Sequence, residues 1–399
     1  MRAIKGLTPN AFLKYFLDSF DYADYVTGST RFKLTQGAMN SIPVLLTPFP
    51  EQERIVAKIR QLLADVDKAK ERLQERVPNI LKRFRQSILT AACSGKLTED
   101  WRNQRDGLDT GGQLVERIVK QRATDSLDWP RAMRRTDAEV PDGWCWTSLD
   151  TLIIDGPQNG LYKPSSEYGE GGSPIIRIED FQNDSVRTRT ELSKLRVSKQ
   201  EADKYAVHPN DLVINRVNSP SHIGKCLLVP PNLCPAVFES NMMRITLSPE
   251  ISPVWVATYI RSDGGRARLT ADAKWAVNQV SINQTDVVTT PVPIPSRREQ
   301  DEIVRRVEAL FELADAIEKR VAAASLRAER LTQAILAKAF RGELVPTEAE
   351  LARHEGREYE PASVLLERIR SNVSGNGDNV GRRARNKSRL KHGSKPPKH

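Results

Sequence analysis

Polar and basic side chains of the types that bind nucleic acid gather in the second half of the chain. Lysine and arginine neutralise phosphates, whereas arginine, asparagine and glutamine can form paired hydrogen bonds with base edges. The densest group is the stretch NRVNSPSHIGK at 215–225, which directly follows the apolar run LVI at 212–214. Loops that follow a strand commonly carry function, because the strand supports them rigidly. The candidate contacts to DNA are Gln158, Asn159, Tyr162, Lys163, Arg177, Arg216, Asn218, Ser219, Ser221, His222, Lys225, Lys274, Asn278 and Gln279.

Each of these residues taken singly is more often a solvated loop residue than a contact, and only the 215–225 stretch rises above that alternative. The chain carries none of the common catalytic signatures. It has no GxxxxGK(S/T) phosphate loop, no glycine-rich adenosylmethionine loop with an NPPF-like motif and no HExxH. The acidic pair Glu179 and Asp180 lacks the closely following lysine of a metal nuclease. We therefore assign no catalytic residue, no metal ligand and no cofactor.

The candidate contacts need a β scaffold, and the segment from 141 to 295 predicts one. Helical periodicity disappears there, and short apolar runs alternate with turn residues. A Ser-Pro pair at 252 and 253 predicts the start of a helix over 252–262. The size suits one compact, mostly β domain. The predicted strands are 144–154, 174–181, 211–217, 225–230 and 242–248.

An internal repeat flanks this domain. The segment PFPEQERIVAKI from Pro48 matches PIPSRREQDEIVRRV from Pro293, and the two Glu-Gln pairs lie 248 residues apart. Further matches follow in the same order along both copies. Each copy therefore predicts a long helix, a glycine stop, a loop and a second short helix. The later matches pair QSILTAACSGKL (86–97) with QAILAKAFRGEL (333–344), and LVERI (114–118) with LLERI (365–369).

Both long helices are amphipathic, with apolar residues three and four apart. Helices of about 40 residues, or about 60 Å, are too long to be covered by a small domain, so the natural cover for each is the other. The alternative to this pairing is that the two helices are merely similar and that each packs in a core without the other. Pro78 should kink or divide the first helix. The predicted seam comprises Ile55, Ile59, Leu62, Leu63, Val66, Leu73, Ile303, Val307, Leu310, Phe311, Ala314, Ile317 and Val321.

Length, charge and cysteine usage bound the class of protein. A chain of 399 residues allows two or three domains, and no apolar run is long enough to cross a membrane. The formal net charge is +10, much of it in the tail at 372–399, which predicts a disordered basic tail. The N-terminus lacks a signal-peptide pattern, so we expect a cytoplasmic protein. Reduced structural thiols are expected at Cys93, Cys145, Cys226 and Cys234.

Several of these motifs together resemble the specificity subunit of type I restriction-modification enzymes. They are the PEQERIV and REQDEIV helix starts, the ILxxAxxGxL helix ends, the Pro-Asp-Gly-Trp opening at 141–144 and the DLVINRVNSPSHIGK stretch at 211–225. The resemblance implies an α+β architecture. Mostly β target recognition domains alternate with long helices, which pair as an antiparallel coiled coil and space the domains. The resemblance further implies that each recognition domain reads one half of a bipartite DNA site.

The resemblance also implies a division of this chain. Because TPNAFLKYFLDS at 8–19 aligns with SPVWVATYIRSD at 252–263, we expect Met1 to fall inside the first recognition domain. The implied domains are a remnant of the first recognition domain (1–50), a first helical region with a linker (51–140), the second recognition domain (141–295), a second helical region (296–371) and the tail (372–399).

The implied function is non-catalytic binding of double-stranded DNA, with a scaffold for methyltransferase subunits and a restriction and translocase subunit. A second specificity chain is a further candidate partner. Two alternatives stay open at this point. One is a coiled-coil adaptor whose β domain binds protein, and the other is an inactive, truncated specificity subunit.

Overall fold

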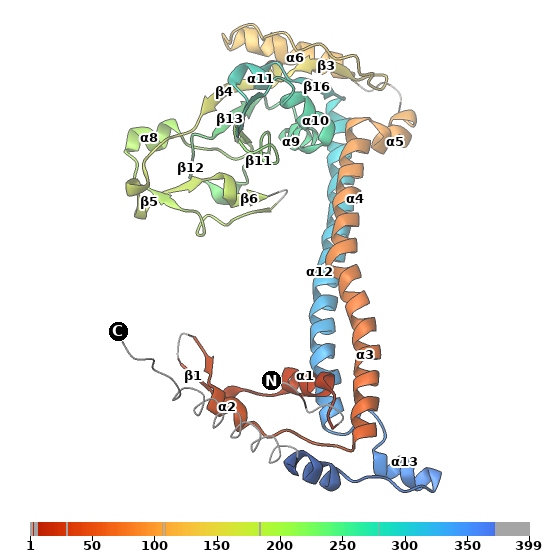
Figure 1. Ribbon diagram of the computed structural model, residues 1–399. Helices are drawn as coiled ribbons and strands as arrows, with labels where there is room; N and C mark the ends of the chain where they lie inside the picture. Colours follow the sequence, from red (N-terminus) through yellow and green to blue (C-terminus); the bar gives the residue numbers. More distant parts are fainter. Residues whose placement is uncertain are drawn as a thin grey trace, which may run out of the picture. The chain divides into compact units, whose positions relative to one another are not determined.

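Two units with separate apolar cores make up the structure. The first unit contains Met1–Pro78 and Glu318–His399, and the second unit contains Asn79–Ile317. The candidate contact Asn278 and the basic tail lie outside the described residues. The computed structural model describes residues 3, 7–28, 31–105, 107, 109–182, 185–277 and 279–371 (Figure 1).

The first unit is mostly helical. Its elements are α1 (Asn10–Ser19), β1 (Val26–Thr27), β2 (Lys33–Leu34), α2 (Gln36–Asn40), α3 (Phe49–Glu71), the part of α12 (Arg297–Phe340) from residue 318 onward, α13 (Glu348–Glu355) and a helix at 362–371. Phe12 of α1 and Ile59 of α3 are fully buried, and they share a core with Leu336 of α12. The ring of Phe340 lies edge-on against Phe12, with ring centroids 5.3 Å apart. The core of this unit is therefore a contact among three helices.

The long helices pair in opposite directions within each unit. In the first unit, the beginning of α3 packs against the end of α12, and Lys70 Nζ donates a hydrogen bond to Thr332 Oγ1 (3.1 Å). In the second unit, Leu89 near the end of α4 (Val77–Cys93) shares a core with Ile303 and Val307 near the start of α12. This order confirms the predicted antiparallel coiled coil. Every residue of the predicted seam is buried or half-buried.

The first long helix departs from α geometry just before its proline. A π-helical turn at Arg72–Arg76 joins α3 to α4, and Pro78 is the second residue of α4. Proline has no N–H to donate to the carbonyl four residues earlier and clashes with it, so the turn before it cannot keep regular α-helical hydrogen bonds. The predicted interruption is confirmed at this point. The second long helix, α12, continues unbroken over 44 residues.

The second unit carries the predicted β domain. Its other helices are α5 (Glu99–Asn103), α6 (Gly111–Thr124), α7 (Leu149–Leu152), α8 (Lys199–Lys204), α9 (Pro253–Arg261), α10 (Asp263–Leu269) and α11 (Gln284–Val288). Its strands are β3 (Cys145–Ser148), β4 (Ile153–Asn159), β5 (Tyr168–Ile176), β6 (Phe181–Gln182), β7 (Ser185–Val186), β8 (Lys194–Leu195), β9 (Leu212–Asn215), β10 (Val217–Asn218), β11 (Cys226–Leu228), β12 (Val237–Phe238), β13 (Met242–Leu247), β14 (Lys274–Ala276), β15 (Gln279–Ser281) and β16 (Pro291–Ile294).

An antiparallel sheet in the order β11-β9-β13-β4 is the centre of this domain. Successive side chains of a strand point to opposite faces. Leu212 and Ile214 of β9 accordingly enter the core that contains α9, whereas Val213 enters a second core with Phe238 of β12. The sheet β12-β5-β8 lies over that second core, in the lobe that also holds α8 (Figure 1). The central sheet is therefore covered on both faces.

Helix α9 confirms the predicted helix over 252–262 and ties the domain to β16. Trp255 and Tyr259 are buried, and their ring N–H and hydroxyl donate to the backbone oxygens of Pro293 (3.1 Å) and Pro291 (2.7 Å). Three strand predictions need correction. The segment 144–154 is interrupted by the helical turn α7, because the Ser148 side chain caps that turn by accepting a hydrogen bond from the backbone of Thr151. The segment 211–217 divides into β9 and β10. The segment 174–181 is broken after Ile176 by a 3-10 turn at Ile178–Asp180, in which the Asp180 carboxylate accepts a hydrogen bond from the Arg177 backbone (2.7 Å).

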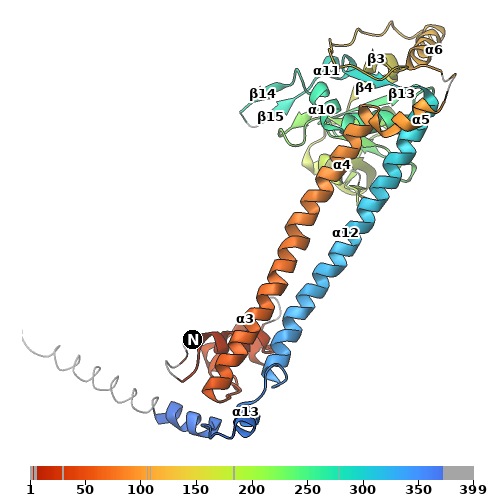
Figure 2. The same ribbon diagram turned by 90° about the vertical axis from the view of Figure 1, so that its right-hand side faces the viewer.

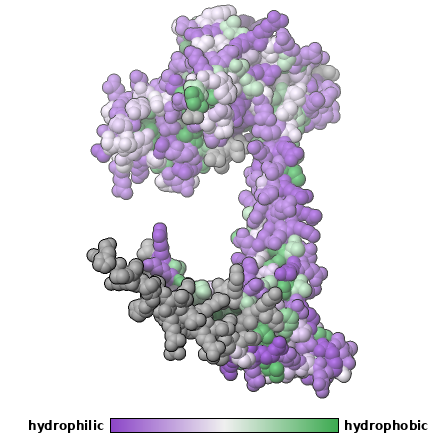
Figure 3. Space-filling model, viewed as in Figure 1, coloured by the Kyte–Doolittle hydropathy of each residue, from purple (hydrophilic) through white to green (hydrophobic). Residues whose placement is uncertain are grey.

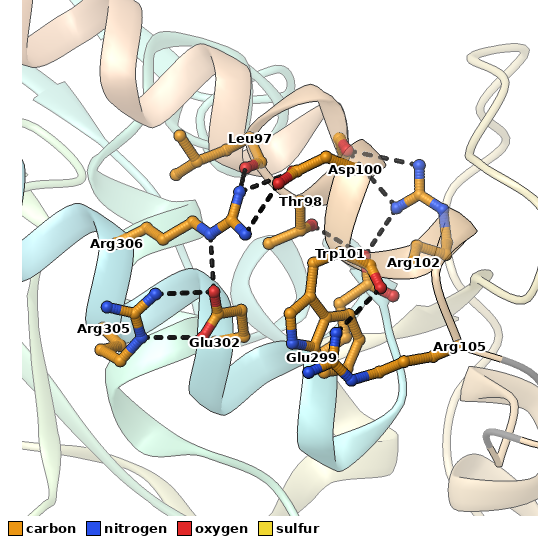
Figure 4. A network of polar contacts seen from close by, with 11 residues as sticks. Leu97, Thr98, Asp100, Trp101, Arg102, Arg105, Glu299, Glu302, Arg305 and Arg306 are labelled. Carbon is orange, nitrogen blue, oxygen red and sulfur yellow. Dashed lines mark hydrogen bonds and ion pairs between the residues drawn. The ribbon is translucent and has the colours of Figure 1, made fainter.

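A polar network holds the start of α12 to the rest of the second unit (Figure 4). Glu299 is buried, and its carboxylate accepts hydrogen bonds from Thr98 Oγ1 (2.8 Å), Arg102 (2.6 Å) and the indole N–H of Trp144 (2.9 Å). The next residue, Gln300, donates to the Pro295 backbone oxygen (3.0 Å). The Glu-Gln pair of the repeat is therefore the anchor between the long helix and the β domain.

A second set of ion pairs beside this anchor predicts a pH dependence of stability. Hydrogen bonds from Arg305 and then Arg306 hold the pKa of Glu302 down at about 2. Because this pKa is below the unfolded value of 4.5, the stabilisation is complete above about pH 4.5 and is lost as the pH falls toward 2. We expect Glu302→Gln to lower the free energy of unfolding at neutral pH by roughly 1 kcal/mol.

Urea unfolding of both proteins between about pH 5 and about pH 3 checks this expectation, since the difference should shrink across that range. A difference that stays constant there would contradict the role given to the Glu302 carboxylate.

Candidate nucleic-acid interface

Strand pairing brings two distant groups of predicted contacts together. Strand β15 pairs with β10 on one side and with β14 on the other, so Asn218, Val280 and Trp275 lie in one row across the sheet. Lys274 and Gln279, both exposed, lie on the opposite face, because side chains alternate along a strand. The β14–β15 hairpin projects from the β domain (Figure 2). The 215–225 loop and this hairpin therefore form one surface, which we call the basic loop surface, made of residues 215–225, 273–277 and 279–283.

Arg216 holds this surface together from within. Its backbone N–H donates to the Asn241 oxygen (2.8 Å), and its backbone oxygen accepts from the N–H of Ile282 (2.9 Å). Its guanidinium donates to the Ser240 oxygen (3.1 Å), and its Nε is buried with no hydrogen-bond partner among the described residues. Arg216 thus joins three segments and supports the loop, in addition to the contact role that the sequence predicts for it.

The loop from Asn218 to His222 is held by its own side chains. The hydroxyls of Ser219 and Ser221 each lie 2.9 Å from His222 Nδ1, and the Ser219 backbone N–H donates to Asn218 Oδ1 (2.6 Å). Burial lowers the pKa of His222, and the nearby positive charges of Lys225 and Arg266 lower it further. A neutral imidazole offers one donor and one acceptor, so this loop can present neutral hydrogen-bonding groups at pH 7.

The charges of the basic loop surface are uncompensated. Residues 215–225 and 273–283 contain Arg216, Lys225 and Lys274 but no aspartate or glutamate. Among the described residues, none of these three cations forms an ion pair. Burial, followed by the charge of Arg266, lowers the pKa of Lys225. A group of cations without acidic partners favours binding of a polyanion such as the DNA backbone.

A second predicted group borders this surface. The Ser240 backbone oxygen accepts a hydrogen bond from Arg216, and the Ser240 backbone N–H donates to the Leu161 oxygen (3.0 Å). Asn159 and Tyr162, on either side of Leu161, therefore lie near the basic loop surface. Tyr162 is 78% exposed, whereas Gln158 uses its amide to donate to the Lys204 oxygen (3.0 Å). Tyr162 and the exposed Asn159 are thus available to a ligand.

Two predicted cations differ from the others because acidic residues compensate them. Lys163 Nζ lies 2.7 Å from a carboxylate oxygen of Glu201, which raises the pKa of the lysine. Arg177 forms ion pairs with Glu179 (2.8 Å) and Glu239 (3.5 Å). These side chains remain candidates by position, but their charge is already balanced within the protein.

Three features of the site were missed by sequence reasoning. Trp275 is 72% exposed and Val277 is 98% exposed, both on the hairpin between Lys274 and Gln279. Arg266 of α10 donates to the backbone oxygens of Ile223 (2.8 Å) and Pro220 and so supports the loop from behind. The signal in the sequence for Trp275 and Val277 was that these two apolar residues interrupt the polar stretch KWAVNQ at 274–279.

Neither a metal-ligand group nor a candidate membrane-spanning helix is found in the part of the chain that the structure describes. Among these residues, no three His, Cys, Asp or Glu side chains are grouped so that they could hold a metal ion. Within the same residues, no helix has the length and apolar character needed to span a bilayer. The face of the β domain seen in Figure 3 is mostly hydrophilic.

A β domain with exposed polar and basic loops, inserted between two helices that pair antiparallel, defines an α+β class of nucleic-acid-binding scaffold. A solved structure concerned with complex assembly and conformational transition of the type I R-M system shares this fold. Its TM-score is 0.55 at 19% identity, over 86% of this chain and 74% of that one. No protein-family model matches the chain.

Sequence similarity then identifies the family. The chain is 33% identical over 350 residues to the type I restriction enzyme StySPI specificity subunit of Salmonella potsdam, covering 86% of this chain and 67% of that protein. It is 30% identical over 381 residues to the EcoKI specificity subunit of Escherichia coli (strain K12), covering 92% and 73%. The chain belongs to the type I restriction enzyme specificity subunits. It spans about two thirds to three quarters of the length of these relatives.

Proposed function

We propose that this chain directs a type I restriction-modification complex to its DNA target, and that the domain at 141–295 reads one half of a bipartite duplex site. The basic loop surface is the observation that carries this proposal. It combines uncompensated cations, suited to phosphates, with Asn, Gln and Ser side chains, suited to base edges. The chain itself does no chemistry in this proposal and needs no cofactor of its own.

The helical regions at 51–140 and 296–371 would bind methyltransferase subunits and, through them, the restriction and translocase subunit. Residues 1–50 would belong to a first recognition domain. Equivalent hydrogen bonds in the two repeat copies support this division. Gln52 donates to the Thr47 oxygen (2.7 Å), as Gln300 donates to the Pro295 oxygen, with the same offset of 248 residues. The complex would act in the cytosol, on the DNA found there.

Methylation mapping tests the proposal. The chain is co-expressed with the methyltransferase subunit of its own system, and modified bases are mapped across the host genome by long-read sequencing. We expect a sequence motif whose modification requires this chain, with the methyltransferase subunit alone as the control. A bipartite asymmetric motif would mean that another chain supplies a second recognition domain. A palindromic motif would mean that two copies of the domain at 141–295 read both halves. No motif with intact partner subunits would overturn the proposal.

A further inference from the structure

Strand β14 of the β14–β15 hairpin is exposed on both of its faces. Lys274, Trp275 and Ala276 are all exposed although they alternate between the two faces of β14, and Val277 at the tip is 98% exposed. Scattered apolar residues are normal on a protein surface, but contiguous ones mark interaction sites. Trp275 and Val277 lie two residues apart toward the end of the hairpin, both exposed, and we call them its apolar tip. The hairpin itself projects from the domain (Figure 2).

The base of this hairpin is fixed while its tip is free. Val280 and Ile282 are each 1% exposed and belong to the main core of the domain. Strand β15 lies between β14 and β10, and the backbone N–H of Ile282 donates a hydrogen bond to the backbone oxygen of Arg216. The hairpin therefore holds its tip in a defined position before any partner binds, which reduces the ordering cost of binding.

Charge indicates what covers the tip. Residues 273–283 contain Lys274 and no acidic residue, and the neighbouring loop adds Lys225. A partner must therefore offer negative charge at the sides and apolar surface in the middle. A duplex groove offers both, since phosphates line its edges, and base edges with the thymine methyl groups form its floor. The major groove admits a two-stranded β-ribbon.

We propose that the β14–β15 hairpin enters a groove of the DNA half-site, where Trp275 and Val277 contact the bases and Lys274 contacts the backbone. This inference rests on the proposed function, because it names the element with which the domain at 141–295 reads its site. Trp275 and Val277 then determine specificity, while the cations around them supply affinity for any sequence.

Affinity for two duplexes separates these roles. The full chain, in complex with its methyltransferase subunit, is titrated with a duplex carrying the motif mapped in cells and with a duplex whose half-site is scrambled. We expect Trp275→Ala with Val277→Ala to weaken binding to the specific duplex about tenfold or more, and to leave binding to the scrambled duplex unchanged. Trp129→Ala is the matched control, because Trp129 is 80% exposed in the same unit and lies outside the basic loop surface.

Photo-crosslinking gives a measurement that needs no variant. A specific duplex with 5-iododeoxyuridine in the half-site should crosslink to the peptide that contains Trp275. The inference would be overturned if the double variant bound the specific duplex as tightly as the unsubstituted protein and if the crosslinks formed only outside the peptide that contains Trp275. The inference would also be overturned if the variant lost its methyltransferase subunit but kept its affinity for DNA, because the tip would then contact protein. If the unsubstituted complex itself fails to distinguish the two duplexes, the proposed function fails instead.

Discussion

Replacing Glu299 by alanine should destabilise the second unit by about 3 kcal/mol, because removing one member of a buried, hydrogen-bonded ion pair leaves its partners without compensation. The carboxylate accepts from Thr98 in the turn before α5, from Arg102 in α5 and from Trp144 at the domain opening. All six tryptophans of the chain lie within residues 79–317. Urea unfolding followed by tryptophan fluorescence therefore reports on this unit.

The matched control lies on the same helix. Glu308 is exposed, and Glu308→Ala should change the free energy of unfolding by no more than about 0.5 kcal/mol. Equal unfolding midpoints for the two variants would show that Glu299 is not the anchor. A loss of stability in the first unit alone, with the unfolding transition seen by tryptophan fluorescence unchanged, would also show that Glu299 is not the anchor.

Removing Lys225 and Lys274 together should lower DNA affinity about a hundredfold at low salt, roughly tenfold for each lysine, since a charged hydrogen bond contributes on the order of 1.5 kcal/mol. The loss should be similar for every duplex, because phosphate contacts carry no sequence information. The slope of log affinity against log salt concentration should fall by about 1.8, about 0.9 for each phosphate contact. Titrations at several salt concentrations measure both quantities.

Lys163→Ala provides the comparison for this double variant. Its ammonium is already paired with Glu201 (2.7 Å), so its removal should change the salt slope by much less than the loss of an unpaired lysine. If the double variant Lys225→Ala with Lys274→Ala keeps the salt slope of the unsubstituted protein, the phosphate contacts lie elsewhere on the domain. The same conclusion follows if Lys163→Ala lowers the salt slope as much as the double variant does.

These two variants separate stability from binding in one unit. Glu299 lies in the buried anchor and should change unfolding, whereas Lys225 and Lys274 lie on the basic loop surface and should change binding. Arg216 should affect both folding and binding, because its backbone and guanidinium hydrogen bonds join three segments. A change at Arg216 would therefore mix loss of contact with loss of loop geometry, and it is a poorer test of the interface than either lysine.

The sequence alone determined the helical pairing and the β character of the inserted domain. Apolar spacing of three and four is a local property, so the seam from Ile55 to Leu73 and from Ile303 to Val321 is recognisable from the order of residues. Pro78 acts through its own missing N–H, and the π-helical turn lies just before it. The repeated Glu-Gln pairs at 51 and 299 mark the start of each helix in the same way, since direct comparison of the two segments shows the repeat.

Only the tertiary structure decided which of the polar candidates form one surface and which are already paired. The pairing of β10 with β15 joins residues about sixty positions apart, and no periodicity encodes such a pairing. Ion pairs such as Lys163 with Glu201 depend on the same long-range placement. Exposure of Trp275 depends on it too, because a tryptophan in a strand is equally compatible with a core and with a bare hairpin. Local patterns specify elements, but the charge and exposure of a surface follow from what folding places beside each side chain.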